Sequence, residues 1–119
     1  VDIIGVCVCI DYLDVSEIIC SYPPSGSGSV ETSHGKLPVP VPAVVEIARE
    51  NNIQLIWDQS HPKEELTTPT GIALMAVFAT EFGQPNSLSI SSIGVGLGLL
   101  APPVVLGNSL LLNTKASIL

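Results

Sequence analysis

The chain has 119 residues, enough for a modest hydrophobic core and for at most one ordinary domain. Eleven acidic residues against four basic ones give a net charge of -7, so we expect neither nucleic acid nor an anionic membrane surface as a partner. Hydrophobic residues make up 46% and charged residues only 13%, which predicts apolar surface that faces further segments of a longer chain or second copies in a homo-oligomer. The three cysteines have no Cys-x-x-Cys spacing, which favours reduced thiols and a cytoplasmic location.

The first part of the chain predicts short elements. Val1–Leu13 is apolar almost throughout, and its β-branched residues favour a strand by propensity alone. Glu17–Tyr22 is a short apolar run that ends at two prolines, which predicts a strand. Residues 25–33 are rich in Gly, Ser and Thr and predict a loop or bulged hairpin that can bring backbone close to a ligand.

The middle of the chain predicts two helices and a strand. Alternating prolines at 38, 40 and 42 keep the backbone extended, and Pro42 is suited to be the first residue of an amphipathic helix over Ala43–Asn51. Ile53–Trp57 predicts a strand. Thr68–Pro69 predicts a helix start, and the apolar run Ile72–Phe82 predicts a helix that ends at Gly83.

The uncharged stretch 83–114 predicts strands rather than a membrane helix. Three glycines and the Pro102–Pro103 pair would fall at the centre of such a helix, so two short strands around a turn are expected. We place strands at Ser87–Ile90 and Val104–Leu112. The whole pattern predicts an α/β fold of short helices alternating with short strands, in a single domain that is part of a larger chain.

Two groups of residues could bind a metal ion. His34 lies in a glycine-flanked loop, where a neutral imidazole is a good ligand for a first-row transition metal; the alternative is a loop histidine that bonds a neighbouring carbonyl. Cys7 and Cys9 would share one face of a strand, but they lie on nearly opposite faces of a helix, where they cannot chelate one ion. Core packing is the favoured interpretation of these two cysteines and of Cys20. We expect His61 to be an ordinary loop residue.

The segment Thr67–Gly71 could bind phosphate. It places hydroxyls and backbone N–H groups at a helix N-terminus, where the dipole attracts anions, although plain helix capping explains the same residues. Gly26 and Gly28 lack the lysine and the spacing of a P-loop. We expect Glu46, Glu64 and Glu65 to face solvent unless one of them acts as a carboxylate ligand. No residue is identified as catalytic.

Several blocks of this sequence resemble the nickel insertion proteins of the lactate racemase system, the LarC family. The blocks cover most of the chain: Val1-Asp-Ile-Ile-Gly5, Gly26-x-Gly28-x-Val30, His34-Gly-x-Leu-Pro-Val-Pro-x-Pro-Ala43, Glu65-Leu-x-Thr-Pro-Thr-Gly-x-Ala73, Phe82-Gly83 and Ile93-Gly-x-Gly96. The two blocks that begin at His34 and Glu65 are the specific ones. The family carries alanine-rich helical sequence at the place of Val1–Leu13. We therefore expect a buried helix there instead of a strand.

The resemblance implies a role in completing a nickel-pincer nucleotide cofactor. Members of the family resemble nickel-inserting lyases, or nickel chelatases, that use CTP with Mg or Mn to activate pyridinium-3,5-bisthiocarboxylic acid mononucleotide and then insert nickel. Residues 1–119 would be a fragment of the N-terminal domain. The metal-binding candidates are then His34, Asp2 and Glu65. The candidates for contacting the mononucleotide are Gly26, Gly28, Thr68, Thr70 and Gly71.

Other parts of the family pattern have no counterpart in this sequence. They are a His-x-His-Glu block, a histidine-rich nickel loop and the nucleotide-binding C-terminal portion, so CTP and its metal would bind through parts not present here. We expect the fragment alone to be inactive. Two hypotheses remain: part of a nickel insertion enzyme, with the remainder of the same protein as its partner, or a non-catalytic structural or interaction domain on the same scaffold.

Overall fold

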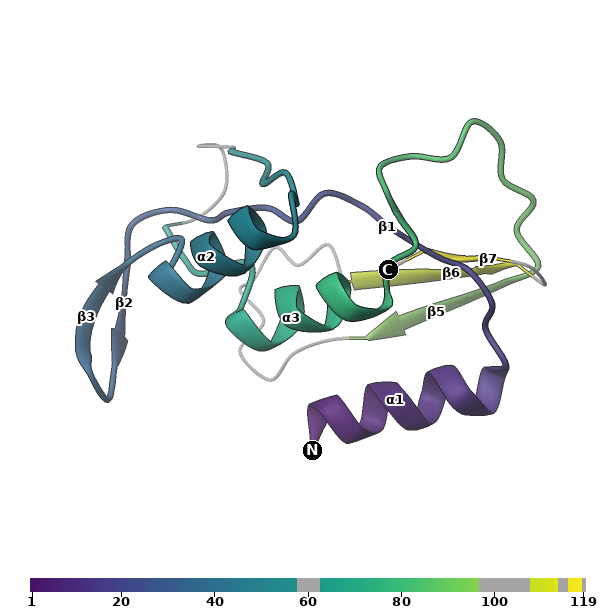
Figure 1. The fold of residues 1–119 in the computed structure, drawn as a ribbon, viewed down its shortest axis with the longest axis horizontal. Coiled ribbons are helices and arrows are strands. Elements are labelled where there is room, and N and C mark those ends of the chain that lie inside the picture. Colours follow the sequence, from purple (N-terminus) through teal and green to yellow (C-terminus); the bar gives the residue numbers. More distant parts are fainter. Residues whose placement is uncertain (58–62, 97–107, 114–115, 119) are drawn as a thin grey trace. The chain divides into compact units, whose positions relative to one another are not determined.

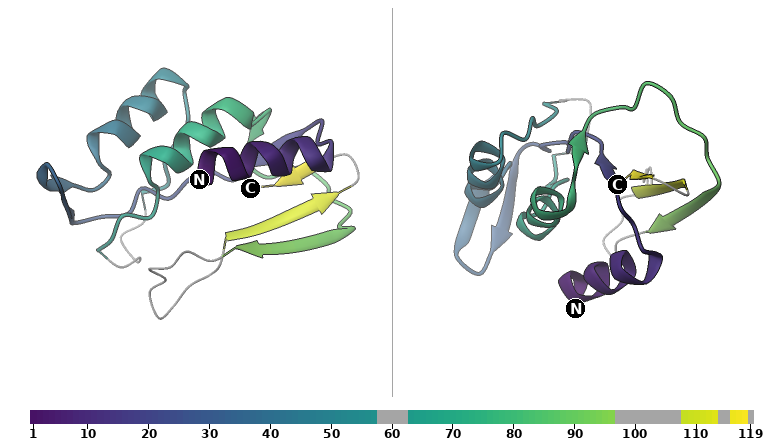
Figure 2. Two further views of the ribbon diagram at one scale, coloured as in Figure 1. Left: turned by 90° about the horizontal axis from the view of Figure 1, so that it is seen from below. Right: turned by 45° about the vertical axis from the view of Figure 1, so that its right-hand side comes forward.

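The computed structural model describes residues 1–57, 63–96, 108–113 and 116–118, with side chains described as far as Gly94. The chain divides into two compact units, one made of Val1–Ser21 with Ala79–Leu119 and the other of Tyr22–Phe78. Figures 1 and 2 show the helices and strands of each. Helices and strands together confirm the expected mixed α/β class.

The first unit begins with helix α1, Asp2–Leu13, which confirms the helix expected there. Asp14 follows in the left-handed conformation and ends the helix, with its N–H bonded to the carbonyl of Asp11. The expectation that this helix is buried was wrong, because none of its residues is buried. Its apolar residues lie on almost every side, and only Val6 and Ile10 are half-buried, so most of that surface faces solvent.

The sheet of the first unit has five strands in the order β4-β1-β7-β6-β5. The strands are β1 (Ile18–Cys20), β4 (Glu81–Phe82), β5 (Ser92–Gly96), β6 (Asn108–Asn113) and β7 (Ala116–Ile118). β1 pairs in parallel with β4 and β7, and the pairs β5–β6 and β6–β7 are antiparallel. All residues of β1 are buried, which confirms the strand expected over Glu17–Tyr22 and matches an apolar strand covered on both faces.

Thr80 fixes the pairing of β1 with β4. Its N–H donates to the carbonyl of Ile18 at 2.8 Å, and its hydroxyl both donates to that carbonyl and accepts from the N–H of Ile18. The helix expected to run from Ile72 to Phe82 therefore ends at Phe78. Residues 81 and 82 pair with β1 instead of continuing the helix.

The strand expected at Ser87–Ile90 was wrong, because the strand forms at Ser92–Gly96. The register explains the shift. Ser92 pairs with Leu112, and β6 ends one residue later at Asn113, so β6 offers no partner to residues 87–90. The antiparallel β5–β6 pair confirms two strands in this stretch; residues 104–107 of the second expected strand lie outside the described residues.

The second unit combines a hairpin with two helices. β2 (Ser29–Thr32) and β3 (Gly35–Pro38) form the antiparallel hairpin, and α2 (Pro42–Glu50) packs against α3 (Pro69–Phe78). α2 begins at Pro42 as expected, because proline needs no N–H at the first helical position. The core of this unit is formed by Val39, Val41, Val44, Ala48, Ile53 and Ile72.

The strand expected at Ile53–Trp57 is reduced to a single bridge between Pro24 and Ile56. The N–H of Ile56 donates to the carbonyl of Pro23, and the N–H of Ser25 donates to the carbonyl of Ile56. Two consecutive prolines offer no N–H of their own, so the ladder cannot extend. Over the described part of the chain, no helix is long and apolar enough to cross a membrane.

Candidate functional site

The glycine-rich loop at residues 25–28 packs against the segment that leads into α3. Ser25 is fully buried, and its hydroxyl donates to the carbonyl of Gly26 at 2.9 Å. The N–H of Ser27 donates to the carbonyl of Glu64 at 3.2 Å. The carbonyl of Gly28 accepts from the N–H of Val39, which connects the loop to the base of the hairpin. The structure therefore brings the glycine loop and the start of α3 together, as two neighbouring parts of the same unit.

Two glycines allow this close approach. Gly26 and Gly28 have φ of 73° and 88°, in the left-handed region that favours glycine. A Cβ on Gly26 would collide with the carbonyl oxygen of Glu64 and lie 2.9 Å from the amide nitrogen of Leu66. A Cβ on Gly28 would lie 3.0 Å from the Cβ of Lys63. Gly26 thus makes room for the chain's own backbone, whereas Gly28 is exposed.

The start of α3 is held by two threonines with different partners. The hydroxyl of Thr67, which is 6% exposed, donates to the carbonyl of Pro24 at 2.6 Å and ties the helix start to the glycine loop. The hydroxyl of Thr68 accepts from the N–H of Gly71 at 3.1 Å, which is the N-cap bond expected from the sequence. The N–H of Gly71 is therefore already used. Thr70 is exposed, and its hydroxyl has no hydrogen-bond partner among the described residues.

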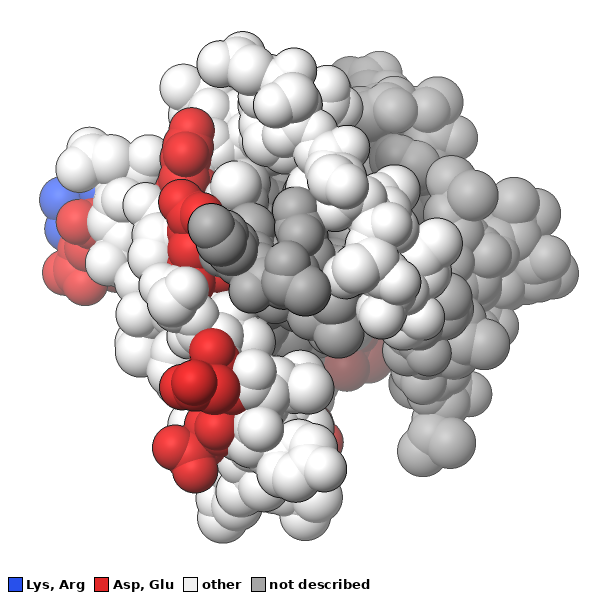
Figure 3. All heavy atoms as spheres, turned by 90° about the vertical axis from the view of Figure 1, so that its right-hand side faces the viewer, with Lys and Arg blue, Asp and Glu red and all other residues white. Residues whose placement is uncertain are grey.

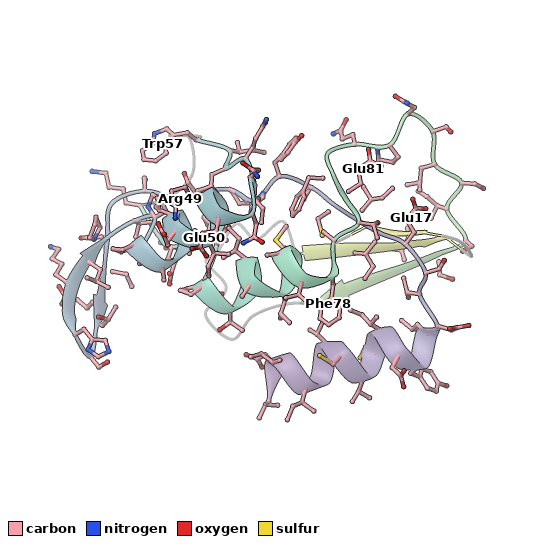
Figure 4. The ribbon with its side chains drawn as sticks, viewed as in Figure 1. Glu17, Arg49, Glu50, Trp57, Phe78 and Glu81 are labelled. Atoms are coloured by element: carbon pink, nitrogen blue, oxygen red, sulfur yellow. The ribbon has the colours of Figure 1, made fainter. Side chains whose placement is uncertain are left out.

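The charges near this unit are mainly acidic. Glu64 is exposed and Glu65 half-buried just before α3, with Lys63 the nearest basic residue in sequence. On α2, the hydrogen bond from Arg49 lowers the pKa of Glu46, and the guanidinium also lies 3.7 Å from the carboxylate of Glu50. Glu46 is exposed to solvent, as expected. The face drawn in Figure 3 carries acidic groups with basic atoms only at its edge, and Figure 4 shows Arg49 and Glu50 on α2.

His34 lies at the tip of the hairpin, in the two-residue turn between β2 and β3. The hydroxyl of Thr32 accepts from the N–H of His34 at 3.1 Å and donates to the carbonyl of Gly35 at 2.8 Å, so one side chain fixes the turn. The imidazole is exposed. Since four strand residues separate the tip from the base of the hairpin, His34 is about 13 Å from the glycine loop.

The three metal-binding candidates come from both units. Asp2 is exposed on the first turn of α1 in the first unit, whereas His34 lies in the hairpin turn and Glu65 just before α3 in the second unit. Within the described ranges, no three His, Cys, Asp or Glu side chains are arranged to hold a metal ion. His61 lies outside the described residues.

The cysteines divide into two kinds. Cys7 and Cys9 are exposed on α1, so core packing was wrong for these two residues, and their spacing places them on nearly opposite sides of the helix. Cys20 is fully buried in β1, which confirms core packing for this residue. Burial raises the pKa of the Cys20 thiol to about 11, because a thiolate would lose its hydration there.

Comparison with known proteins assigns the chain to a family. The profile described as nickel insertion protein matches residues 1–111. The chain belongs to the nickel insertion protein family. An Acetivibrio thermocellus relative, named pyridinium-3,5-bisthiocarboxylic acid mononucleotide nickel insertion protein, is 43% identical over 98 residues, which is 82% of this chain and 24% of that protein. A Cyanothece relative with the name "Putative nickel insertion protein" is 39% identical over 104 residues, 87% of this chain and 25% of that protein.

The chain spans about a quarter of the length of these relatives. No solved structure matches it. The family suggested by the sequence blocks is thereby confirmed, whereas the roles of the individual site residues stay predictions. The partners of the glycine loop, Glu64 and Leu66, were not predicted. They lie about forty residues further along the chain, and no local signal marks a backbone carbonyl as a contact.

Proposed function

We propose that this chain is part of a nickel insertion protein that inserts nickel into pyridinium-3,5-bisthiocarboxylic acid mononucleotide in the cytoplasm. The observation that carries the proposal is the 43% identity to the Acetivibrio thermocellus protein that bears this name. The family profile, which covers all but the last eight residues, supports the same conclusion. Nickel and the pyridinium mononucleotide are the substrates.

His34 is the proposed nickel-binding residue of this part of the protein. Its imidazole is exposed at a turn held by Thr32, so a nitrogen lone pair is available to a first-row metal without rearrangement of the hairpin. A single imidazole holds nickel weakly, so the other donors must come from elsewhere. Asp2 and Glu65 are proposed as carboxylate donors, each to a site completed by other parts of the protein.

The start of α3 is the proposed contact for the phosphate of the mononucleotide. Thr70 supports this role because it is exposed and its hydroxyl has no partner among the described residues, at the positive end of a ten-residue helix. Thr68 and Gly71 contribute indirectly, because their mutual hydrogen bond holds the first turn in place. Gly26 and Gly28 position the loop beside this turn. CTP and a Mg or Mn ion are assigned to parts of a nickel insertion protein outside this chain.

A non-catalytic structural or interaction domain is the second candidate function. The observation that favours it is the filled space beside Gly26, where the chain's own backbone occupies the position that a ligand would need. In this alternative, the glycine loop and the threonine cap serve only to hold the second unit together.

A chimera tests the proposal. The span of the Acetivibrio thermocellus protein that matches this chain is exchanged for this chain, and nickel insertion into the pyridinium mononucleotide is measured by mass spectrometry. We expect product from the chimera and at least a tenfold loss with Thr70→Glu, whose carboxylate repels a phosphate at the helix start. Ser89→Glu, at an exposed position of the other unit, is the matched control. An active chimera that is indifferent to both substitutions favours the structural domain.

A further inference from the structure

One face of α1 is an exposed apolar stripe. At about 100° per residue, Ile4, Gly5, Val8 and Tyr12 fall within one arc of roughly 100° around the helix. Their exposed fractions include 70% for Ile4, 58% for Val8 and 87% for Tyr12. We call these four residues the α1 stripe.

Two further observations favour a docking role for the stripe. Gly5 lies at one edge of the arc, and a Cβ there would meet nothing within 4 Å, so a neighbouring backbone can approach the helix closely at this point. No charged residue lies inside the arc, and Asp11 is at its edge. An apolar stripe of this kind is the core-facing side of an ordinary helix, yet no residue of α1 is buried.

We propose that the α1 stripe docks onto the part of the nickel insertion protein that lies outside the span matched by this chain. The relatives are about four times as long as the matched span, so most of their polypeptide is available as an intramolecular partner. A second copy of this chain is a poorer occupant. Stable interfaces between separate proteins use roughly 20–30 residues a side, many more than the four of the stripe, whereas a linked segment needs far less area.

The inference rests on the proposed function in one respect: the partner of the stripe is taken to be another part of a nickel insertion protein. Docking is measured by accessibility and nickel insertion by product formation. A chimera that forms product with an open stripe overturns the docking alone. A chimera with a covered stripe and no product overturns the proposed function alone.

Thiol labelling tests the docking directly. Val8→Cys is introduced into the 119-residue chain and into the chimera, both with Cys7→Ser and Cys9→Ser, and the rate of maleimide labelling is compared. Cys20 stays as a buried internal reference. We expect rapid labelling in the 119-residue chain and at least a tenfold slower rate in the chimera. Glu46→Cys, on the solvent face of α2, is the control and should be labelled equally in both proteins.

Three results overturn the inference. Equal rates for Val8→Cys in the two proteins would show that the stripe stays open. Slow labelling in the 119-residue chain that speeds up on dilution would identify a second copy as the occupant. A further variant, Val8→Asp, should lower the melting temperature of the chimera by several degrees and leave that of the 119-residue chain nearly unchanged, since Val8 is 58% exposed there. Equal shifts would also contradict the docking.

Discussion

Substitution of Gly26 by alanine should destabilise the second unit. The loss of stability should be larger than for the same substitution at Gly5 or Gly35. The new Cβ would collide with the carbonyl oxygen of Glu64 and lie 2.9 Å from the amide nitrogen of Leu66. Both contacts are backbone atoms, which cannot rotate away as a side chain can. The loop or the 64–66 segment must therefore move, and the hydrogen bond from Ser27 to Glu64 is strained or lost.

The magnitude follows from two contributions. A non-glycine residue in the left-handed region costs about 1–2 kcal/mol, and loss of one backbone hydrogen bond costs about another 1 kcal/mol. We expect Gly26→Ala to lower the free energy of unfolding by about 2–3 kcal/mol. Gly35→Ala isolates the first contribution, because Gly35 has φ of 99° but nothing within 4 Å of its Cβ position. Gly5→Ala, inside α1, should stabilise by about 0.5–1 kcal/mol.

Urea unfolding measures this series. Far-UV circular dichroism follows both units, and fluorescence of Trp57, the single tryptophan, follows the second. The expected order of stability is Gly5→Ala, wild type, Gly35→Ala and Gly26→Ala, from highest to lowest. Equal losses for Gly26→Ala and Gly35→Ala would show that the loop does not pack against the 64–66 segment, and the account of the glycine loop would fail.

Three further predictions concern single side chains. Thr68→Ala should lower the free energy of unfolding by about 1 kcal/mol through loss of the N-cap bond to Gly71, whereas Thr70→Ala should change it by less than about 0.5 kcal/mol; equal effects in urea unfolding would contradict the cap. Burial raises the pKa of Cys20 from 9.0 to about 11, so on raising the pH the thiol of the unfolded chain loses its proton before that of the folded chain. The free energy of unfolding is therefore full below pH 9 and falls by about 3 kcal/mol as the pH rises through 11. Cys20→Ala should lose this part of the pH dependence, and an unchanged slope would refute the assignment. His34→Ala in the chimera should lower retained nickel, measured by plasma mass spectrometry, at least severalfold, while His61→Ala should not; equal nickel content in both would return His34 to an ordinary turn residue.

Elements with a strong local signal were predictable from the sequence. Pro42 preorganises the first turn of α2, and Thr68 caps α3 with its own hydroxyl, so both helix starts lie where the sequence places them. β1 is similarly predictable, because a short apolar run that ends at Pro23 has few alternatives to a buried strand. In each case, neighbouring residues contain the physical cause.

Elements that depend on distant partners were not predictable in this way. The end of α3 is set by Thr80, which bonds Ile18 across 62 residues. Whether Ser87–Ile90 forms a strand depends on where β6, the strand that would pair with it, ends. The residues of the Ser87–Ile90 segment do not contain that information. The candidate site likewise has one part that was predictable from local sequence and one part that was not. Its glycine loop and helix start were predictable as neighbours, but the backbone that fills the space beside Gly26 was not.

The same principle applies to α1. Its helical state was predicted through the family resemblance, against the β-branched propensity of Val1–Leu13. Its burial was also expected but is not observed, because burial of a helix needs a partner surface. The α1 stripe marks the place where that partner would act.

Formation of the nickelated mononucleotide tests the central claim most directly. The chimera, the 119-residue chain and a chimera with Gly26→Ala are each incubated with pyridinium-3,5-bisthiocarboxylic acid mononucleotide, nickel, CTP and Mg or Mn, and the product is read by mass spectrometry. We predict product from the chimera, none from the 119-residue chain and less from the Gly26→Ala chimera. A folded chimera that retains no insertion activity, or turnover by the 119-residue chain alone, would contradict the claim that this chain is a working part of a nickel insertion protein.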